Sequence, residues 1–95
     1  MVIKEKNKIN RALEPVLAPI YFTQIPLEAI FDTIKKHGYV VVDEAGEPWT
    51  GFICGREGRA TFDIVSQNGI ASKYALQLSW YKMESGRYEV TSYVG

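Results

Sequence analysis

The hydrophobic pattern of the chain changes its period once, at Gly38. Before this glycine, apolar residues recur at steps of three and four, which is the spacing of one helix face. After it, apolar and polar residues alternate, which is the pattern of half-buried strands. A chain of 95 residues has an ordinary size for one domain. We therefore expect a single α+β domain over residues 1–95, with two helices first and strands afterwards.

The first helix is predicted to begin near Ile3. Its apolar stripe consists of Ile9, Ala12, Leu13, Val16 and Leu17. Proline lacks the backbone N–H and clashes with the preceding turn, so Pro15 must end or kink this helix. We expect the helix to run to about Leu13, with Pro15 opening a short second turn or starting the link.

The second helix, predicted over residues 26–37, carries signals at both ends. Pro26 lies in the first turn, where its missing N–H costs nothing. Basic residues near the C-terminal end interact favourably with the helix dipole, and Gly38 is expected to be the left-handed cap. The buried stripe of this helix is formed by Leu27, Ile30, Phe31 and Ile34.

Five strands are predicted after Gly38, over residues 39–43, 49–54, 59–66, 73–83 and 88–94. Their short connections indicate neighbouring antiparallel strands, because parallel strands need a longer crossover. Asn68-Gly69 is typical of a type I′ hairpin turn, and Gly86 suits a left-handed turn position. We expect the two N-terminal helices to pack on one face of a five-stranded antiparallel meander sheet.

The glycine-rich segment GFICGREGR, residues 51–59, invites comparison with a phosphate-binding loop. Its glycine spacing is wrong for a Walker loop, no Lys-Ser/Thr pair follows, and the next segment is predicted as a strand rather than a helix. We expect residues 55–59 to form a hairpin turn in which Gly58 supplies the positive φ.

Catalytic chemistry has one candidate pair, the single cysteine, Cys54, and the single histidine, His37. A nucleophilic cysteine needs a base within hydrogen-bond reach. However, His37 is typical of a helix end, and Cys54 next to an apolar residue is typical of a small buried side chain. A small Cys/His enzyme is therefore an alternative only, and we assign no catalytic residues.

Acidic residues gather near the first turn after the helices. Asp43, Glu44 and Glu47 lie in or beside this turn. Asp32 and Asp63 lie elsewhere in the sequence. The chain has neither a Cys/His pair at zinc-ligand spacing nor a calcium-binding loop. These acids are best explained as solvated side chains beside a turn, and we expect no metal or cofactor.

The charge balance narrows the classes of partner. Eleven basic residues match eleven acidic ones, so no overall field attracts nucleic acid or an anionic membrane. The longest apolar run, residues 16–22, is interrupted by Pro19 and is too short to span a bilayer. The N-terminus lacks the apolar run of a signal peptide, and one cysteine excludes an internal disulfide. We expect a cytoplasmic protein without a membrane partner.

The hairpin LSWYKMESGRYEVTSYVG is the richest source of candidate binding residues. Alternation places Trp80 with Leu76 and Leu78 on the covered face of the sheet. The opposite side is predicted to present Tyr81, Met83 and Tyr93 among Gln77, Ser79, Thr91, Lys82 and Arg87. Tyrosine, methionine and arginine are enriched at protein interfaces. The competing structural explanation is a short sheet that simply leaves one aromatic face half exposed.

The leading hypothesis is a non-enzymatic protein-binding module or a homodimer built through the sheet. Binding would use the aromatic face, with Arg56 and Arg59 nearby, or residues 88–94 if they form an edge strand. The alternative is a nucleic-acid-binding protein that uses the same face. Its cations would be Arg56, Arg59, Lys82 and Arg87. The neutral chain makes nucleic acid the less favoured partner.

The segments PWTGFICGREGRATFD and LSWYKMESGRYEV resemble those of short accessory proteins carried by phages and other mobile elements. The resemblance lies in the small, compact α+β character without a catalytic signature, and it covers most of the strand-rich half. Such proteins often occupy a surface of a host protein, as anti-CRISPR and related anti-defence inhibitors do. The resemblance implies an inhibitor or regulator of a host protein. It carries over no site residues, because that group has no shared motif.

Overall fold

The described residues form two helices and a four-stranded antiparallel sheet, which confirms the predicted α+β class but not the predicted five strands. The computed structural model describes residues 2–19, 22–51, 53, 55–68 and 71–95. Its elements are α1 (Val2–Val16), α2 (Leu27–Lys36), β1 (Tyr39–Val42), β2 (Glu57–Ser66), β3 (Ala71–Lys82) and β4 (Tyr88–Val94). In the described part of the chain, neither helix combines the length and apolarity needed to cross a membrane.

Helix α1 continues beyond the predicted end at Leu13 and includes Pro15 in its last turn. A proline at this position removes only one intrahelical hydrogen bond. The next backbone bond is kept, because the Leu17 N–H donates to the Leu13 carbonyl at 3.1 Å. Val16 and Leu17 also pack against the core, which holds the last turn in place.

Helix α2 lies where the sequence signals predict it, although Pro26 is its N-cap residue rather than a member of its first turn. Gly38 follows it with φ of +88°, in the left-handed region, and its N–H donates to the Lys35 carbonyl. Ile30 and Ile34 are fully buried, whereas Leu27 and Phe31 are half-buried. The predicted apolar stripe is therefore the face that packs on the sheet.

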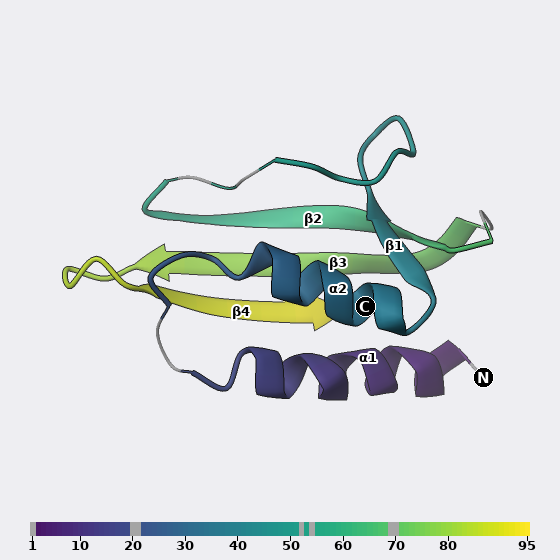
Figure 1. Cartoon of the computed structure of the whole chain (residues 1–95), viewed down its shortest axis with the longest axis horizontal. Coiled ribbons are helices and arrows are strands. Elements are labelled where there is room, and N and C mark those ends of the chain that lie inside the picture. Colours follow the sequence, from purple (N-terminus) through teal and green to yellow (C-terminus); the bar gives the residue numbers. More distant parts are fainter. Residues whose placement is uncertain (1, 20–21, 52, 54, 69–70) are drawn as a thin grey trace.

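The sheet is a meander with the strand order β1-β2-β3-β4, in which every neighbouring pair is antiparallel. Figure 1 shows α2 lying over one face of this sheet and α1 running along β4. The even-numbered residues of β4, and those of β3 from Tyr74 onwards, point towards the helices. They include Leu76, Leu78, Val90 and Val94, which form one buried cluster with Ile9, Leu13, Ile30 and Ile34.

The predicted strand over residues 49–54 is not found: the described residues 49–51 and 53 lie outside the four strands. Among the described residues here, a single bridge, Val42 with Pro48, begins such a pairing. The Trp49 ring instead packs edge-on against Phe31 at 5.6 Å and Phe62 at 5.1 Å. This packing places the Trp49 side chain between α2 and β2, which gives a physical reason why the described residues 49–51 and 53 do not continue as a strand.

The predicted hairpin turn over residues 55–59 is also displaced. Strand β2 already begins at Glu57, and Gly58 lies within it without a positive φ. Gly55 takes the left-handed conformation instead, with φ of +110°. Gly58 is needed for a different reason: a Cβ there would lie 2.5 Å from Cζ2 of Trp80, so the indole packs directly on the glycine backbone.

Of the two remaining predicted turns, the structure confirms the one at Gly86 and not the one at Asn68-Gly69. Gly86 has φ of +86° between β3 and β4, and its N–H donates to the Met83 carbonyl, as expected for a left-handed turn glycine. The predicted type I′ turn at Asn68-Gly69 is wrong at Asn68, which lacks the positive φ that this turn requires. Gly69, the other residue of the predicted turn, lies outside the described residues.

The outer edge of β4 is covered by other parts of the chain. The Asn10 side chain of α1 donates to the Val94 carbonyl at 2.9 Å and accepts from the Val94 N–H at 2.8 Å. At the other end of the strand, Phe22 and Tyr88 exchange two backbone hydrogen bonds. Because both ends are paired, α1 and its following segment act as a partial partner for an edge strand.

Replacing Asn10 by alanine is expected to lower the free energy of unfolding by about 1–3 kcal/mol. The reason is that the part-buried N–H and carbonyl groups of Val94 would both lose their hydrogen bonds to the Asn10 side chain. The measurement is urea denaturation followed by tryptophan fluorescence and circular dichroism. Asn7→Ala on the exposed side of the same helix is the matched control. Equal losses in the two variants would show that the Val94 bonds contribute nothing specific.

Candidate functional site

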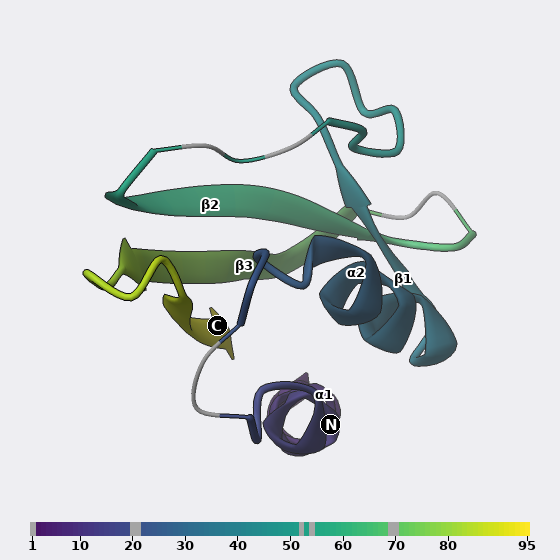
Figure 2. The same ribbon diagram turned by 60° about the vertical axis from the view of Figure 1, so that its left-hand side comes forward.

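The sheet has one face that no helix of the described chain covers. Both helices pack on the opposite side, as the two views in Figures 1 and 2 agree. The odd-numbered residues of three strands point to this side, which we call the bare face. It consists of Glu57, Arg59, Thr61 and Asp63 of β2, Ala75, Gln77, Ser79 and Tyr81 of β3, and Glu89, Thr91 and Tyr93 of β4.

Two tyrosines stand out on the bare face. Tyr81 is 53% exposed and Tyr93 is 49% exposed, and they are the exposed large hydrophobic side chains of the described chain. On the other side of the same strands, Leu78 and Val90 are buried. The sequence prediction that Tyr81 and Tyr93 share the open face, while Trp80 and the leucines share the covered one, is confirmed.

The pairing of the strands arranges the bare face in rows. Tyr81 lies directly between Glu57 on β2 and Glu89 on β4. The next row joins Arg59, Ser79 and Thr91, and a third joins Thr61, Gln77 and Tyr93. Directly opposed side chains on neighbouring strands have Cβ atoms about 4.5–5.5 Å apart, so each row forms one contiguous strip.

A shallow hollow of about 550 Å³ covers the first two rows. It is lined by Glu57, Gly58, Arg59, Ser79, Trp80, Tyr81, Glu89 and Thr91. Two carboxylates and one guanidinium line it, so the hollow carries a small excess of negative charge. The end of the bare face with Tyr81 is therefore both concave and acidic.

The end of the bare face with Tyr93 is more occupied. The ammonium nitrogen of Lys6, on α1, lies 5.6 Å from the centre of the Tyr93 ring, within the range of a cation–π contact. The same ring lies over the backbone of Gly95, where a Cβ would be 2.5 Å from Tyr93 Cε1. Tyr93 is thus held in place by its own chain.

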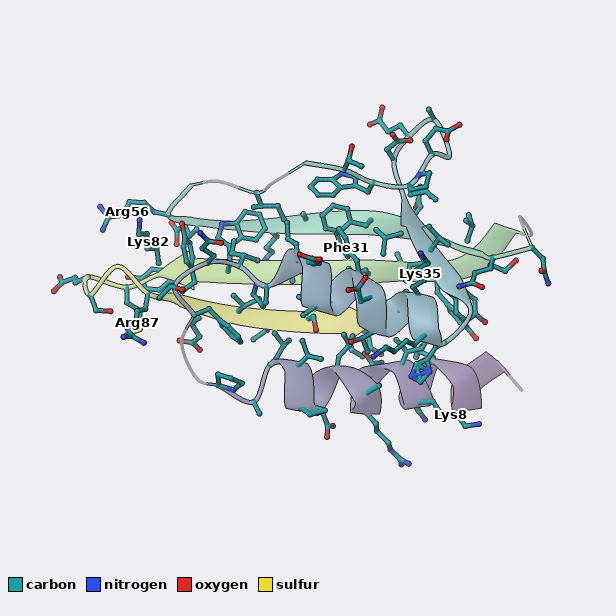
Figure 3. All side chains as sticks on the ribbon, in the orientation of Figure 1. Lys8, Phe31, Lys35, Arg56, Lys82 and Arg87 are labelled. Carbon is teal, nitrogen blue, oxygen red and sulfur yellow. The ribbon has the colours of Figure 1, made fainter. Side chains whose placement is uncertain are left out.

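The other predicted binding residues do not all share this face. Lys82 stands opposite Tyr88, with its ammonium nitrogen 5.5 Å from that ring, on the side of the sheet that the helices cover. Met83 is half-buried and Arg87 exposed in the turn between β3 and β4, and Arg56 is exposed just before β2. Figure 3 shows Arg56, Lys82 and Arg87 at the same end of the sheet.

The alternative site at β4 is less open than the sequence suggests. Strand β4 is an edge strand, as that hypothesis requires. However, Phe22 and Asn10 already pair with its two ends, and α1 runs along the edge between them. A partner strand would have to compete with these contacts, because a regular ladder needs every second residue of the edge to be accessible.

The Cys54–His37 pair stays a prediction, because Cys54 lies outside the described residues. His37 is exposed at the end of α2, where its backbone N–H donates to the Ile34 carbonyl. No three side chains able to bind a metal gather within the described part of the chain. Asp43 has a structural role: its carboxylate accepts hydrogen bonds from the N–H groups of Ala45 and Glu47, closing the turn after β1.

Sequence reasoning missed two residues that the structure brings to the tyrosines. Glu57 was expected in a turn, so its position beside Tyr81 depends on the observed start of β2. Lys6 lies 87 positions before Tyr93 in the chain, and only the packing of α1 along β4 brings them together. Alternation alone identifies Glu89, because it shares the parity of Thr91 and Tyr93.

Comparison of the chain with known proteins identified no relative. A scan against models of protein families found no match, and searches of curated proteins and of solved structures found none either.

Tyr81→Ala is expected to change the free energy of unfolding by less than about 1 kcal/mol, because the side chain is exposed and surface substitutions have small effects. Leu78→Ala on the same strand is the control for a core position, with an expected loss of about 2–5 kcal/mol. Urea denaturation measures both. A loss at Tyr81 comparable to that at Leu78 would mean that this tyrosine supports the core rather than a surface.

Proposed function

We propose that the chain is a non-enzymatic protein-binding module whose interface is the bare face of the sheet. The observation that carries this proposal is the exposure of Tyr81 and Tyr93 on the one sheet face that the described helices leave uncovered. Scattered exposed aromatics are normal, but two on one regular surface offer a partner rigid apolar area at low entropic cost. The proposed site is therefore the bare face rather than the edge of β4.

The composition of the bare face supports a protein partner. Its aromatic side chains lie among short polar ones, with Ser79 and Gln77 at the centre and Thr91 beside them. Protein interfaces combine such aromatic anchors with polar groups around them. Gln77 and Thr91 are exposed and Ser79 is half-buried, so these side chains can hydrogen-bond a partner without rearrangement of the core.

The distribution of cations favours protein over nucleic acid. Sheets that bind single strands frame their aromatic residues with positive charge. Here Arg59 lies on the bare face, but Lys82 is engaged with Tyr88 on the covered side. Two glutamates flank Tyr81, and they would repel a phosphate backbone. Fluorescence anisotropy with a labelled oligonucleotide at low salt tests this alternative, which predicts affinity that falls steeply as salt rises.

The biological role within this proposal is that of an inhibitor or regulator of a host protein, acting in the cytoplasm. This part rests on the resemblance to accessory proteins of mobile elements. A module of this kind acts by occupying a surface on its target, so it needs a binding interface and no catalytic residues. A homodimer formed through the same face is the other form of the proposal.

Site-specific photo-crosslinking tests the interface. A photoreactive side chain in place of Gln77, at the centre of the bare face, is expected to trap a partner in a lysate of the native host. The same group in place of Asp32, which is exposed on α2, is the matched control. The adduct should disappear when Tyr81→Ala and Tyr93→Ala are combined, because those changes remove the aromatic anchors without unfolding the chain.

The mass of the adduct separates the two forms of the proposal. Twice the mass of the chain identifies a homodimer, and any other protein identifies a heterologous partner. Equal trapping from positions 77 and 32, or an adduct that survives both tyrosine substitutions, would refute the bare face as the interface.

A further inference from the structure

The row that contains Tyr81 has a specific chemical character. An exposed aromatic ring lies between two exposed carboxylates, Glu57 on one neighbouring strand and Glu89 on the other. Adjacent strands are about 4.8 Å apart, so the two glutamates bracket the ring within about 10 Å. The negative face of the ring and both carboxylates favour a positive charge above Tyr81.

No cation of the described chain takes this position. The cation–π contacts among the described residues are those of Lys6 with Tyr93 and of Lys82 with Tyr88. Tyr81 is the more exposed of the two tyrosines on the bare face. Arg59 lines the same hollow but lies in the next row, so the acidic row leaves the position over the Tyr81 ring open to a further positive charge.

We propose that Glu57, Tyr81 and Glu89 form a docking site for an arginine side chain of a partner protein. This inference rests on the proposed function and names the chemistry of its interface. A guanidinium is planar, stacks on aromatic faces and presents donors at its edges. Placed over Tyr81, it directs those donors towards a carboxylate on either side, which gives charge-assisted hydrogen bonds.

The neighbouring Arg59 sets the strength of this site. It lies in the next row on the same strand as Glu57 and lines the same hollow. Its positive charge opposes a second cation, so removing it should strengthen binding, whereas removing either carboxylate should weaken it. These opposite changes in affinity distinguish an electrostatic docking site from a general loss of surface structure, which would weaken binding in every variant.

The test uses a capped peptide, acetyl-Gly-Arg-Gly-amide, as the probe. Titration into ¹⁵N-labelled protein is expected to shift the amide resonances of Glu57, Tyr81 and Glu89 saturably. The same peptide with citrulline in place of arginine is the control, because it keeps the shape of the side chain and loses the charge. The citrulline peptide should cause clearly smaller shifts at the same concentration.

Single variants then assign the site. Glu57→Gln and Glu89→Gln should each weaken binding about two- to fivefold, the scale of an exposed ion pair. Arg59→Gln should strengthen it by a similar factor. Glu84→Gln, an exposed glutamate in the turn beside the site, is the matched control and should leave affinity unchanged. Equal binding of the citrulline peptide, or equal effects of Glu84→Gln and Glu89→Gln, would overturn the inference.

Other occupants give distinguishable results. Concentration-dependent shifts at the same row without any peptide would identify a second copy, and displacement of the peptide by an oligonucleotide would identify nucleic acid; either outcome overturns the inference. If the arginine peptide does not bind but the crosslink at position 77 depends on the tyrosines, the proposed function stands and the arginine site fails. If the peptide binds and no partner is trapped, the site stands and the proposed function fails.

Discussion

The alternation of strand β3 is the constraint on which the rest of the structure depends. Over residues 76–81 this strand pairs with both β2 and β4, so the even-numbered side chains of that stretch face the same way. Leu76 and Leu78 are almost completely buried, and a slip of one residue would expose both. The register of both neighbouring strands follows from that burial. The helices then pack where the apolar side chains are.

The same alternation creates the bare face. Once the even-numbered residues are covered, the odd-numbered ones of three strands share the other side without any helix of the described chain above them. Tyr81 and Tyr93 are therefore exposed because Leu78 and its neighbours are buried. The fold protects its β4 edge with Asn10 and Phe22, while it leaves this face open. That contrast is the physical basis for proposing the bare face, rather than the edge of β4, as the interface.

Much of the architecture follows from local signals. The period change at Gly38, the burial stripe of α2 and the exposure of Tyr81 were all predictable from residue spacing. The predicted fifth strand failed because Trp49 finds aromatic partners in Phe31 and Phe62, a tertiary contact that outweighs local strand propensity. The glycine-rich segment misled in a similar way. Its glycines suit a turn, yet Gly58 lies within β2, where the Trp80 indole packs against its backbone.

Residue order by itself determined the fold class, the two helices and the division of the last hairpin into a covered and an open side, because periodicity is a local property that each strand or helix carries alone. Only the tertiary structure decided which residues stand beside one another. The bracketing of Tyr81 by Glu57 and Glu89 depends on the register between three strands. The contact of Lys6 with Tyr93 depends on how α1 packs along β4. These long-range pairings arise from burial of the common core, and they give the bare face its chemical character.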